Sequence, residues 1–500
     1  MSCAAASSAE QISHGSLTFR SDCRPQLKAH ELQLIEETRA EIVRNWPVFD
    51  QVPPFGPLCE QGFEYLPSLM IEDHSGIQLS AQGHANQNLS YRSIMLAGDE
   101  DLVAVYGSRD ICFESYCRQR LGLGEPRVFA PNIADLPKSL ANACLSDDVF
   151  IAEAVETARA AGGMNIVPYM ATGVVWRLGA EIAKRAKVRV HIAGPKPSLT
   201  RAVNDKLWFS RWAGRLLGKD AVPHTRTVYG MGAMVGHLRR FMRQHRAVAI
   251  KLSHSAASMG NMVFDSTAFA GIGAAAMAQQ LGSAMQERKW VNPFPLQVTA
   301  WEGPVLASPS VQLWIPKRGE GAPIIEGIFD QITSGTIARF AGGVPTALGE
   351  RVKSKIAREA AMLGLLFQSL GYFGRCSFDA LIVGEKEQSC DLHWVECNGR
   401  WGGISIPLTI ANRLVPDWRA GGFLVFSHHS NDGASIRLEQ FLSQHDDLML
   451  RAGVACGAVL LTPGTLISGR IELLILAEDQ VSALAIADRF APLTIAPPSG

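Results

Sequence analysis

Two common features are missing from this 500-residue sequence: an excess of one charge and a long apolar run. Lys and Arg together number 47, and Asp and Glu also number 47, so the formal net charge is zero. A chain without a positive excess is not built along its whole length to neutralise a nucleic-acid backbone, although it can still contain a local basic cleft. No apolar run approaches the roughly 18–20 residues that cross a bilayer. We therefore expect neither a nucleic-acid partner nor a membrane-spanning helix.

The sequence also lacks the signals of export and of disulfide or zinc chemistry. Its first residues, MSCAAASSAEQISHGS, contain no basic segment and no continuous apolar segment, so they do not resemble a signal peptide. The ten cysteines are scattered, and none forms a CxxC pair. Cys112 and Cys117 are close in sequence, but their spacing fits no zinc site. This pattern indicates reduced thiols in a cytoplasmic protein.

The composition that is present is globular, with 19% charged and 47% apolar residues, and the length predicts about three domains. Strands and helices alternate from about residue 88. A strand at 164–170 precedes a helix at 172–186, and a strand at 187–192 precedes an amphipathic helix at 199–217. This rhythm predicts an α/β protein with an open, largely parallel sheet.

The rest of the chain continues as strands and helices of mixed order. Residues 222–302 predict strand, helix, strand, Ser/Gly-rich loop, helix and strand, and 413–435 are loop-rich enough to suggest a domain boundary. The tail, 436–500, predicts helix, strand, strand and helix. Further elements are expected as a helix at 30–46, a hairpin over 308–332, a long helix at 349–370, and strands at 373–383 and 391–398.

The segment 371–407 carries the clearest chemical signal. Asp379 lies in one apolar strand, and Glu396 and Asn398 lie two residues apart in the next, so the latter two side chains point to the same face. If the strands are adjacent, three oxygen-bearing side chains meet, which is a set that Mg²⁺ accepts together with nucleotide phosphates. Without a cation, one of two neighbouring carboxylates has to retain its proton. The alternative is that Asp379 and Glu396 are separate surface residues.

Two lysines lie near features that can hold phosphate. Lys251 ends an apolar strand and precedes the Ser/Gly-rich loop 253–260, in which Ser253, Ser258 and Gly260 could offer hydroxyl and backbone N–H groups. Taken alone, this pattern also fits a plain hairpin loop, because the P-loop motif is absent. Lys206 belongs to an Asn-Asp-Lys triplet within a helix, where a solvated surface charge is the alternative.

In this order and spacing, the set resembles the ATP-grasp superfamily. The resemblance covers about 130–415 and implies that Lys206, Lys251 and the 253–260 loop hold the phosphates of ATP. It implies that Asp379, Glu396 and Asn398 hold Mg²⁺, and that Arg400 faces the reacting carboxylate. It also implies a loop at 253–260 that closes as a lid to exclude water from the intermediate.

Within the superfamily, the segments ECNGRWGGISIP, PSVQLWIP and VLLTPGTLISGRIELLIL resemble peptide ligases of the pheganomycin-biosynthesis type. That resemblance implies three parts: an N-terminal and Rossmann-like pre-ATP-grasp region at 1–198, an ATP-grasp domain at 199–430, and a small α+β module at 431–500. The lid subdomain of the ATP-grasp domain is expected at about 222–300.

Some positions depart from the pattern of related amide ligases. Those enzymes often have an Arg two residues before the metal-binding Asp, where this chain has Ser377; Arg375, four residues before, shares the same strand face and is the substitute candidate for a catalytic role. The adenine-binding hinge is expected near Thr299, Trp301 and Glu302, and Glu302 could bind ribose or cap a turn. Arg339 could hold a substrate carboxylate or be a solvated loop charge.

The resemblance implies an ATP- and Mg²⁺-dependent carboxylate–amine ligase that forms an amide or peptide bond through an acyl phosphate and releases ADP and phosphate. The expected partners are a small-molecule carboxylate and an amine, such as amino acids or peptides, and a homodimer is a reasonable expectation. The alternatives are a ligase that uses ammonia, bicarbonate or a thiol, a small-molecule kinase, or a nucleotide-binding module without catalysis.

Overall fold

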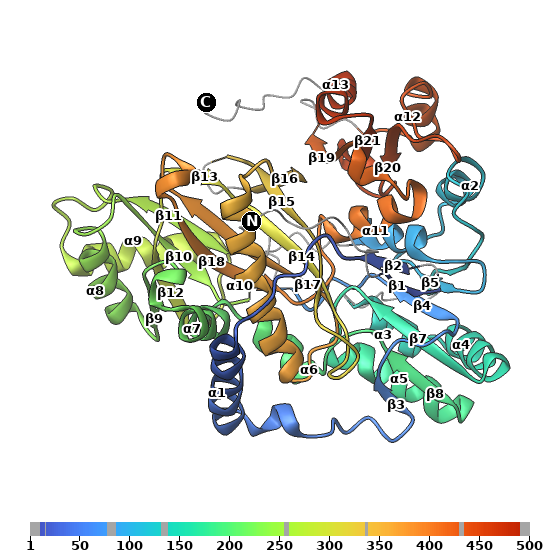
Figure 1. The fold of residues 1–500 in the computed structure, drawn as a ribbon, viewed down its shortest axis with the longest axis horizontal. Coiled ribbons are helices and arrows are strands. Elements are labelled where there is room, and N and C mark those ends of the chain that lie inside the picture. Colours follow the sequence, from blue (N-terminus) through green and yellow to red (C-terminus); the bar gives the residue numbers. More distant parts are fainter. Residues whose placement is uncertain are drawn as a thin grey trace.

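The computed structural model describes residues 11–15, 17–77, 87–131, 139–254, 260–335, 339–429 and 435–490. Its strands form a parallel sheet, a large sheet and a smaller four-stranded sheet, beside a short hairpin of β1 (Gln11–His14) and β2 (Leu17–Arg20) (Figure 1). In the described part of the chain, no helix combines the length and hydropathy needed to cross a bilayer.

The parallel sheet has six strands in the order β3-β8-β7-β4-β5-β6. Its inner strands are almost wholly buried, and the helices that follow them are capped by side chains that the sequence supplies: Asp147 accepts from the first turn of α4, and Thr172 from the first turn of α5. The predicted parallel sheet is therefore confirmed. The bounds are β3 (Cys59–Gln61), β4 (Ser68–Ile71), β5 (Leu102–Ala104), β6 (Arg127–Phe129), β7 (Gly163–Pro168), β8 (Arg189–Ile192), α3 (Leu140–Ser146), α4 (Asp148–Ala161) and α5 (Gly173–Ala186).

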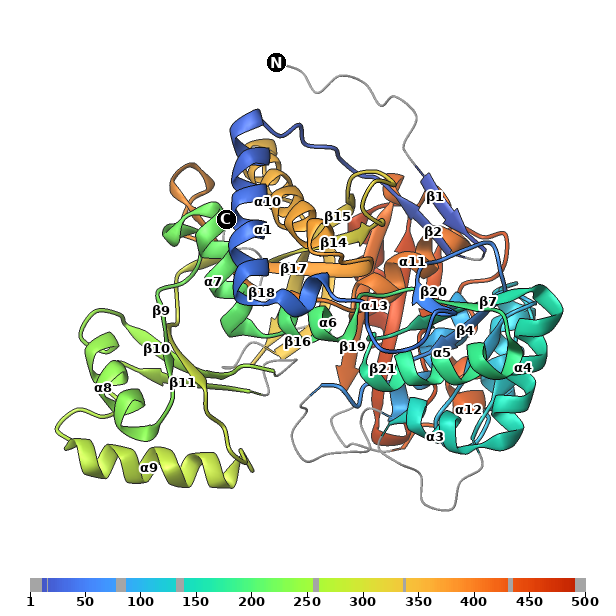
Figure 2. The same ribbon diagram turned by 90° about the horizontal axis from the view of Figure 1, so that it is seen from below.

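The large sheet has nine strands, in the order β13-β17-β14-β15-β16-β19-β21-β20 with β18 on the other side of β17. The predicted hairpin and the two predicted strands after the long helix are present. The bounds are β13 (Val305–Ala307), β14 (Pro309–Ile315), β15 (Ile324–Ser334), β16 (Arg339–Pro345), β17 (Gly374–Val383) and β18 (Asp391–Asn398). Three helices pack along the side of this sheet, namely α10 (Glu350–Ser369), α1 (Ala29–Asn45) and α7 (Lys206–Leu217) (Figure 2).

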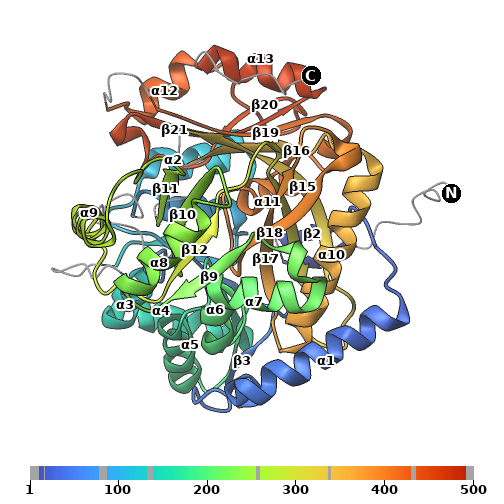
Figure 3. The ribbon, with the colours of Figure 1, turned by 90° about the vertical axis from the view of Figure 1, so that its left-hand side faces the viewer.

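The C-terminal strands β20 (Gly457–Leu460) and β21 (Arg470–Ala477) extend the large sheet through β19 (Gly422–His429), so they do not form a sheet of their own. They lie between α13 (Gln480–Phe490) on the outside and α11 (Ser405–Leu414) on the inside (Figure 3). The prediction of a loop-rich region over 413–435 is wrong for 422–429. The apolar run FLVF forms a central strand there. Its apolar pattern was too short to predict a strand beside the polar residues that follow it. Two short helices, α2 (Ile111–Ser115) and α12 (Leu438–Gln444), contact each other nearby.

A third sheet, β11-β10-β12-β9, forms a separate lobe with its own methionine-rich core. Its elements follow the predicted order except for an additional strand, β11, after the loop, and Figure 2 shows the lobe standing away from the parallel sheet. The bounds are β9 (Thr225–Val228), α8 (Met231–Phe241), β10 (Ala247–Leu252), β11 (Asn261–Asp265), α9 (Ala274–Glu287) and β12 (Leu296–Ala300).

The amphipathic helix predicted over 199–217 is two helices, α6 (Pro197–Val203) and α7 (Lys206–Leu217). Asn204 ends the first, and the Asp205 side chain accepts a hydrogen bond from Leu207 N at 2.8 Å to cap the second. Asp and Asn favour such caps over helix interiors, because their short side chains bond to the backbone. The break places the Asn-Asp-Lys triplet at a helix start rather than in mid-helix.

Candidate functional site

The two predicted acidic strands are adjacent, and they bring the three candidate metal ligands together. In the antiparallel register of β17 and β18, Asp379 pairs with Glu396, and Ser377 with Asn398. Asn398 Nδ2 donates to Asp379 Oδ2 at 2.9 Å, and Ser310 Oγ on β14 donates to Asp379 Oδ1 at 2.6 Å. The alternative of separate surface carboxylates is therefore wrong.

The charges at this pair are unequal. Burial and the neighbouring Glu396 carboxylate raise the pKa of Asp379 to about 6. Burial also opposes ionisation of Glu396, but the ammonium of Lys206, 2.7 Å away, outweighs it with help from Lys251, so the pKa of Glu396 is lowered. Without a cation, Asp379 therefore ionises less readily than Glu396. This is the behaviour expected of two carboxylates arranged to share a bound cation.

The chemistry of these donors fits Mg²⁺. Among the described residues, no cluster of three or more His, Cys, Asp and Glu side chains is present. The site instead offers two carboxylates and an amide oxygen, and Mg²⁺ is typically held by one or two carboxylates with waters and substrate phosphates completing the shell. Burial and the Glu396 carboxylate raise the pKa of Asp379, and a bound cation would favour its ionised form.

Each member of the Asn-Asp-Lys triplet has a distinct contact. Asn204 Oδ1 accepts from the backbone N–H of Gly399 at 3.1 Å and so holds the turn after Asn398. A Cβ on Gly399 would lie 2.3 Å from Val203 Cγ2, so only glycine permits this approach. Lys206 is only 7% exposed and pairs with Glu396. The alternative of a solvated surface lysine is therefore wrong for Lys206.

Lys251 reaches the same acidic pair from the lobe. Burial lowers the pKa of its ammonium to about 8, although the Glu396 carboxylate opposes the shift, and its Nζ lies 5.5 Å from the Trp301 ring centroid. After it, Ser253 Oγ donates to Pro295 O at 3.0 Å, and Leu252 N donates to Gly260 O at 2.9 Å. The central part of the predicted phosphate loop, 255–259 with Ser258, lies outside the described residues.

The predicted hinge joins the lobe to the large sheet. Thr299 is the penultimate residue of β12, and its hydroxyl hydrogen-bonds with Thr225 Oγ1 at 2.8 Å. Trp301 N donates to Ala247 O at 3.0 Å. Glu302 forms a close ion pair with His393 on β18, and this hydrogen bond raises the pKa of the imidazole. The hinge therefore contacts the metal-site strand through a histidine that the sequence did not suggest.

Arg400 follows the acidic site directly and is held in place on two sides. Its Nη2 donates to Asn398 Oδ1 at 2.6 Å, and its Nη1 donates to the Tyr169 hydroxyl at 3.1 Å. The Tyr169 ring stacks on His74 at a centroid distance of 3.9 Å. His74 in turn hydrogen-bonds Glu72 at 2.8 Å, and Glu72 pairs with the buried Arg92.

Tyr169, His74 and Glu72 were not predicted as site residues. Tyr169 directly follows β7, Glu72 directly follows β4, and His74 comes two residues later, all at the carboxyl ends of strands of the parallel sheet. Ligand sites in such sheets lie at the carboxyl ends of the strands, so this position was a usable signal.

Arg375 is not brought to the site. Arg375 lies on the predicted strand face, but four residues along a strand is about 13 Å. Its guanidinium is buried in an ion pair with Glu326, and it donates to Thr409 Oγ1 at 2.7 Å. It therefore serves the core between β17 and α11 and does not line the site, contrary to the expectation that it approaches Asp379. The side chain of Arg339 lies outside the described residues.

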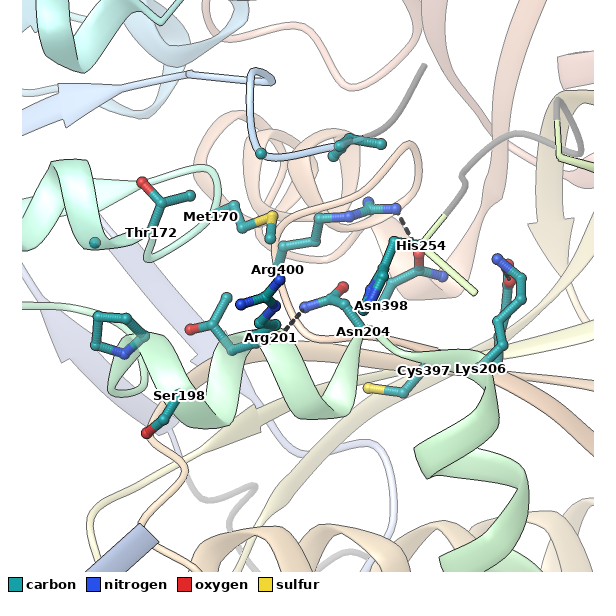
Figure 4. A pocket seen from close by; sticks show the side chains of 16 residues that line it. Met170, Thr172, Ser198, Arg201, Asn204, Lys206, His254, Cys397, Asn398 and Arg400 are labelled. Carbon is teal, nitrogen blue, oxygen red and sulfur yellow. Dashed lines mark hydrogen bonds and ion pairs between the residues drawn. The ribbon is translucent and has the colours of Figure 1, made fainter. Parts of the chain in front are cut away.

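A cavity of about 470 Å³ opens beside the acidic site. Its volume is within the range of small-molecule sites. Glu396, Asn398 and Arg400 line one part, and α6 lines another through Ser198 and Arg201 (Figure 4). The loops after β4 and β7 add Ile77, Met170 and Thr172, and further lining comes from Asn204, Lys206, His254 and Cys397. The cavity thus lies between the acidic strand pair and the parallel sheet.

Comparisons with known proteins agree with this architecture. Residues 90–183 match the family model of the pre-ATP-grasp domain. No curated protein matches the sequence. Biotin carboxylase from Campylobacter jejuni is a similar solved structure, with a TM-score of 0.51 and 14% identity over 84% of this chain and 89% of that chain. The biotin carboxylase domain of 2-oxoglutarate carboxylase from Hydrogenobacter thermophilus has a TM-score of 0.50 and 12% identity over 85% of this chain and 88% of that chain. N5-carboxyaminoimidazole ribonucleotide synthetase from Thermus thermophilus has a TM-score of 0.50 and 14% identity over 86% of this chain and 99% of that chain.

The chain therefore has the expected fold: an α/β ATP-grasp architecture preceded by a pre-ATP-grasp domain with a parallel sheet. At these low identities the similarity describes the fold alone.

Proposed function

We propose that this protein is an ATP-dependent carboxylate–amine ligase that works through an acyl phosphate and releases ADP and phosphate. The observation that carries the proposal is the half-buried Asp379–Glu396 pair, in which Glu396 forms an ion pair with Lys206 and which is followed by Arg400 at the edge of a cavity. The fold is consistent with this, since the similar carboxylase domain from Hydrogenobacter thermophilus was solved with MgADP and bicarbonate.

The residues divide into three binding tasks. Lys206 and Lys251 both lower the pKa of Glu396 and would bind the phosphates of ATP, with Ser253, Ser258 and Gly260 of the loop as further donors. Asp379, Glu396 and Asn398 would hold Mg²⁺, which when bound neutralises phosphate charge and lowers the barrier to phosphoryl transfer. Thr299, Trp301 and Glu302 would bind the adenine and ribose at the hinge.

The chemistry follows from where these groups lie. A carboxylate oxygen of the substrate attacks the γ-phosphorus, the bond to the β–γ bridging oxygen breaks, and ADP leaves. Arg400 is placed to stabilise the acyl phosphate and the later oxyanion, because Tyr169 and Asn398 fix its guanidinium beside the cavity. The amine nitrogen then attacks the carbonyl carbon, phosphate leaves, and the amine proton passes to solvent or to the departing phosphate.

The resemblance to pheganomycin-type peptide ligases supports amino acids or peptides as the carboxylate and the amine. The scattered cysteines support a cytoplasmic location, and a homodimer is the common state of such enzymes. A kinase that stops at phosphoryl transfer would share Lys206, Lys251 and the acidic pair, but it would not need the amine.

The test is to incubate the protein with ATP, Mg²⁺ and pooled amino acids and small peptides, and to identify nucleotides and products by mass spectrometry. The proposal predicts ADP, phosphate and a new mass equal to carboxylate plus amine minus water. ADP release that does not depend on the amine would favour the kinase, and AMP with pyrophosphate would contradict the proposal. Glu396→Gln should abolish ADP formation, whereas Glu385→Gln, at an exposed position in the turn between β17 and β18, should not.

A further inference from the structure

The cavity lies at the point where the parallel sheet reverses its strand order. β4 continues to β5 on one side of the sheet, and β7 continues to β8 on the other, although β4 and β7 are neighbours. The chain therefore leaves the carboxyl ends of these two strands in opposite directions and opens a crevice between them, which is where open α/β sheets bind ligands. Ile77 follows β4, Met170 and Thr172 follow β7, and all three line the cavity.

The charges that line this cavity do not balance. Lys206 and Glu396 form an ion pair and neutralise each other. Arg400 and Arg201 also line the cavity, and neither forms an ion pair within the described residues. A ligand that brings only its reacting carboxylate to Arg400 leaves the charge of Arg201 uncompensated.

Arg201 differs from Arg400 in having no partner of its own. It lies on α6, one turn before the Asn-Asp-Lys triplet, and makes no hydrogen bond or ion pair in the described part of the chain. In Figure 4 it lies within the lining, with Thr172 and Ser198 toward one side and Lys206 toward the other. A guanidinium at the mouth of a cavity with no protein acceptor is available to an anionic group of a ligand.

Beside its polar residues, the cavity lining also contains apolar and small residues. Ile77, Met170, Pro197 and Cys397 contribute hydrocarbon or sulfur, and Gly76 and Gly173 contribute no side chain. A Cβ at Gly76 would lie 2.9 Å from Thr172 Cγ2, so a larger residue there would push into the same crevice. This part of the wall suits an uncharged, hydrocarbon-rich stretch of a ligand.

We propose that the carboxylate substrate is a dianion, in which Arg400 binds the carboxylate that is phosphorylated, Arg201 binds a second carboxylate, and a short hydrocarbon chain joins them. The inference rests on the proposed function. It makes Arg201 a residue that determines specificity and leaves nucleotide binding to Lys206, Lys251 and the hinge.

The test is calorimetric titration of the full-length protein, saturated with MgADP, with matched pairs of ligands: butanedioate and butanoate, pentanedioate and pentanoate, and hexanedioate and hexanoate. At least one dicarboxylate should bind about tenfold more tightly than its monocarboxylate, the effect of one charge-assisted contact. Arg201→Gln should reduce that preference to less than about twofold and leave the Kd of MgADP unchanged. Arg201→Lys, which keeps the charge, should retain part of it.

Arg177→Gln is the matched control, because Arg177 is an exposed arginine on α5 that does not line the cavity. It should keep the full preference for the dicarboxylate, which excludes a general effect of net charge. The inference is overturned if the two ligands of every pair bind equally well, or if none of the ligands binds. It is also overturned if Arg201→Gln loses affinity for MgADP but keeps the preference for the dicarboxylate. If the wild-type protein does not bind MgADP, the proposed function itself fails, so the two failures are distinguishable.

Discussion

Replacing Asp379 by Asn should make the metal-free protein more stable while it removes activity. Burial and the charge of Glu396 raise the pKa of Asp379 from 3.8 to about 6. An ionised carboxylate with a raised pKa destabilises the folded state, because the unfolded chain ionises it more easily. The asparagine side chain has nearly the same shape and carries no charge, so the substitution removes that cost.

The size of the effect follows from the shift. About two pKa units correspond to about 3 kcal/mol at neutral pH, at about 1.4 kcal/mol per unit. Two features reduce this value: the Asp379 side chain is partly exposed, and an amide fits the Asn398 and Ser310 partners less well than the carboxylate does. We therefore expect the free energy of unfolding to rise by about 1–2 kcal/mol. The gain is complete above pH 6, falls to about half by pH 5, and disappears below pH 4, where Asp379 is protonated in both states.

The assay is calorimetric measurement of Tm with EDTA at pH 7.5 and pH 5, and with MgADP at pH 7.5. Asp379→Asn should raise Tm by about 1–2 °C with EDTA at pH 7.5 and by less at pH 5. With MgADP the order should reverse, because only the wild-type protein gains stability from binding the ligand. Asp391→Asn, an exposed carboxylate at the other end of β18, should change nothing. An Asp379→Asn variant that is no more stable than wild type with EDTA at pH 7.5 refutes the reasoning.

Three further predictions concern the same site. Because the pKa of Lys251 is about 8, the affinity for MgADP should be constant below pH 8 and should fall above it. In a titration series from pH 7 to 9.5, Lys251→Arg should abolish that fall. A wild-type affinity that stays constant from pH 7 to 9.5 contradicts the assignment of Lys251 to phosphate binding. Tyr169→Phe removes the hydroxyl that accepts from Arg400 and should lower kcat about tenfold with the KM for ATP unchanged, so a change confined to that KM would exclude a positioning role. The affinity for Mg²⁺ should fall about tenfold per pH unit below pH 6, because Asp379 must lose its proton to bind the ion, and a pH-independent affinity would place the ion elsewhere.

The local part of this structure was readable from the sequence. The apolar runs around Asp379 and Glu396 predicted β17 and β18 almost to their ends, and alternation along a strand placed Glu396 and Asn398 on one face. The ordered spacing of Lys206, Lys251 and the acidic residues then indicated the ATP-grasp fold. These predictions depend on contacts within a strand or between strands that are close in sequence.

The parts that were missed depend on contacts between distant segments. Tyr169 meets Arg400 across 231 residues, and Ser310 meets Asp379 across 69. The same applies to Arg375: strand periodicity placed it on the correct face, but its buried partner Glu326 comes from β15, and nothing in the sequence near Arg375 indicates that pairing. The break at Asn204 was available from cap chemistry, but the amphipathic pattern that runs through it favoured one helix.

The most direct test of the central claim uses the carboxylate substrate labelled with ¹⁸O in both carboxyl oxygens, together with ATP, Mg²⁺ and the amine. An acyl phosphate places one carboxyl oxygen on phosphorus, so each phosphate released with ADP should carry one ¹⁸O atom by mass spectrometry, and Glu396→Gln should release none. Unlabelled phosphate, or ¹⁸O found in AMP, would contradict an acyl-phosphate ligase at the Asp379–Glu396 site.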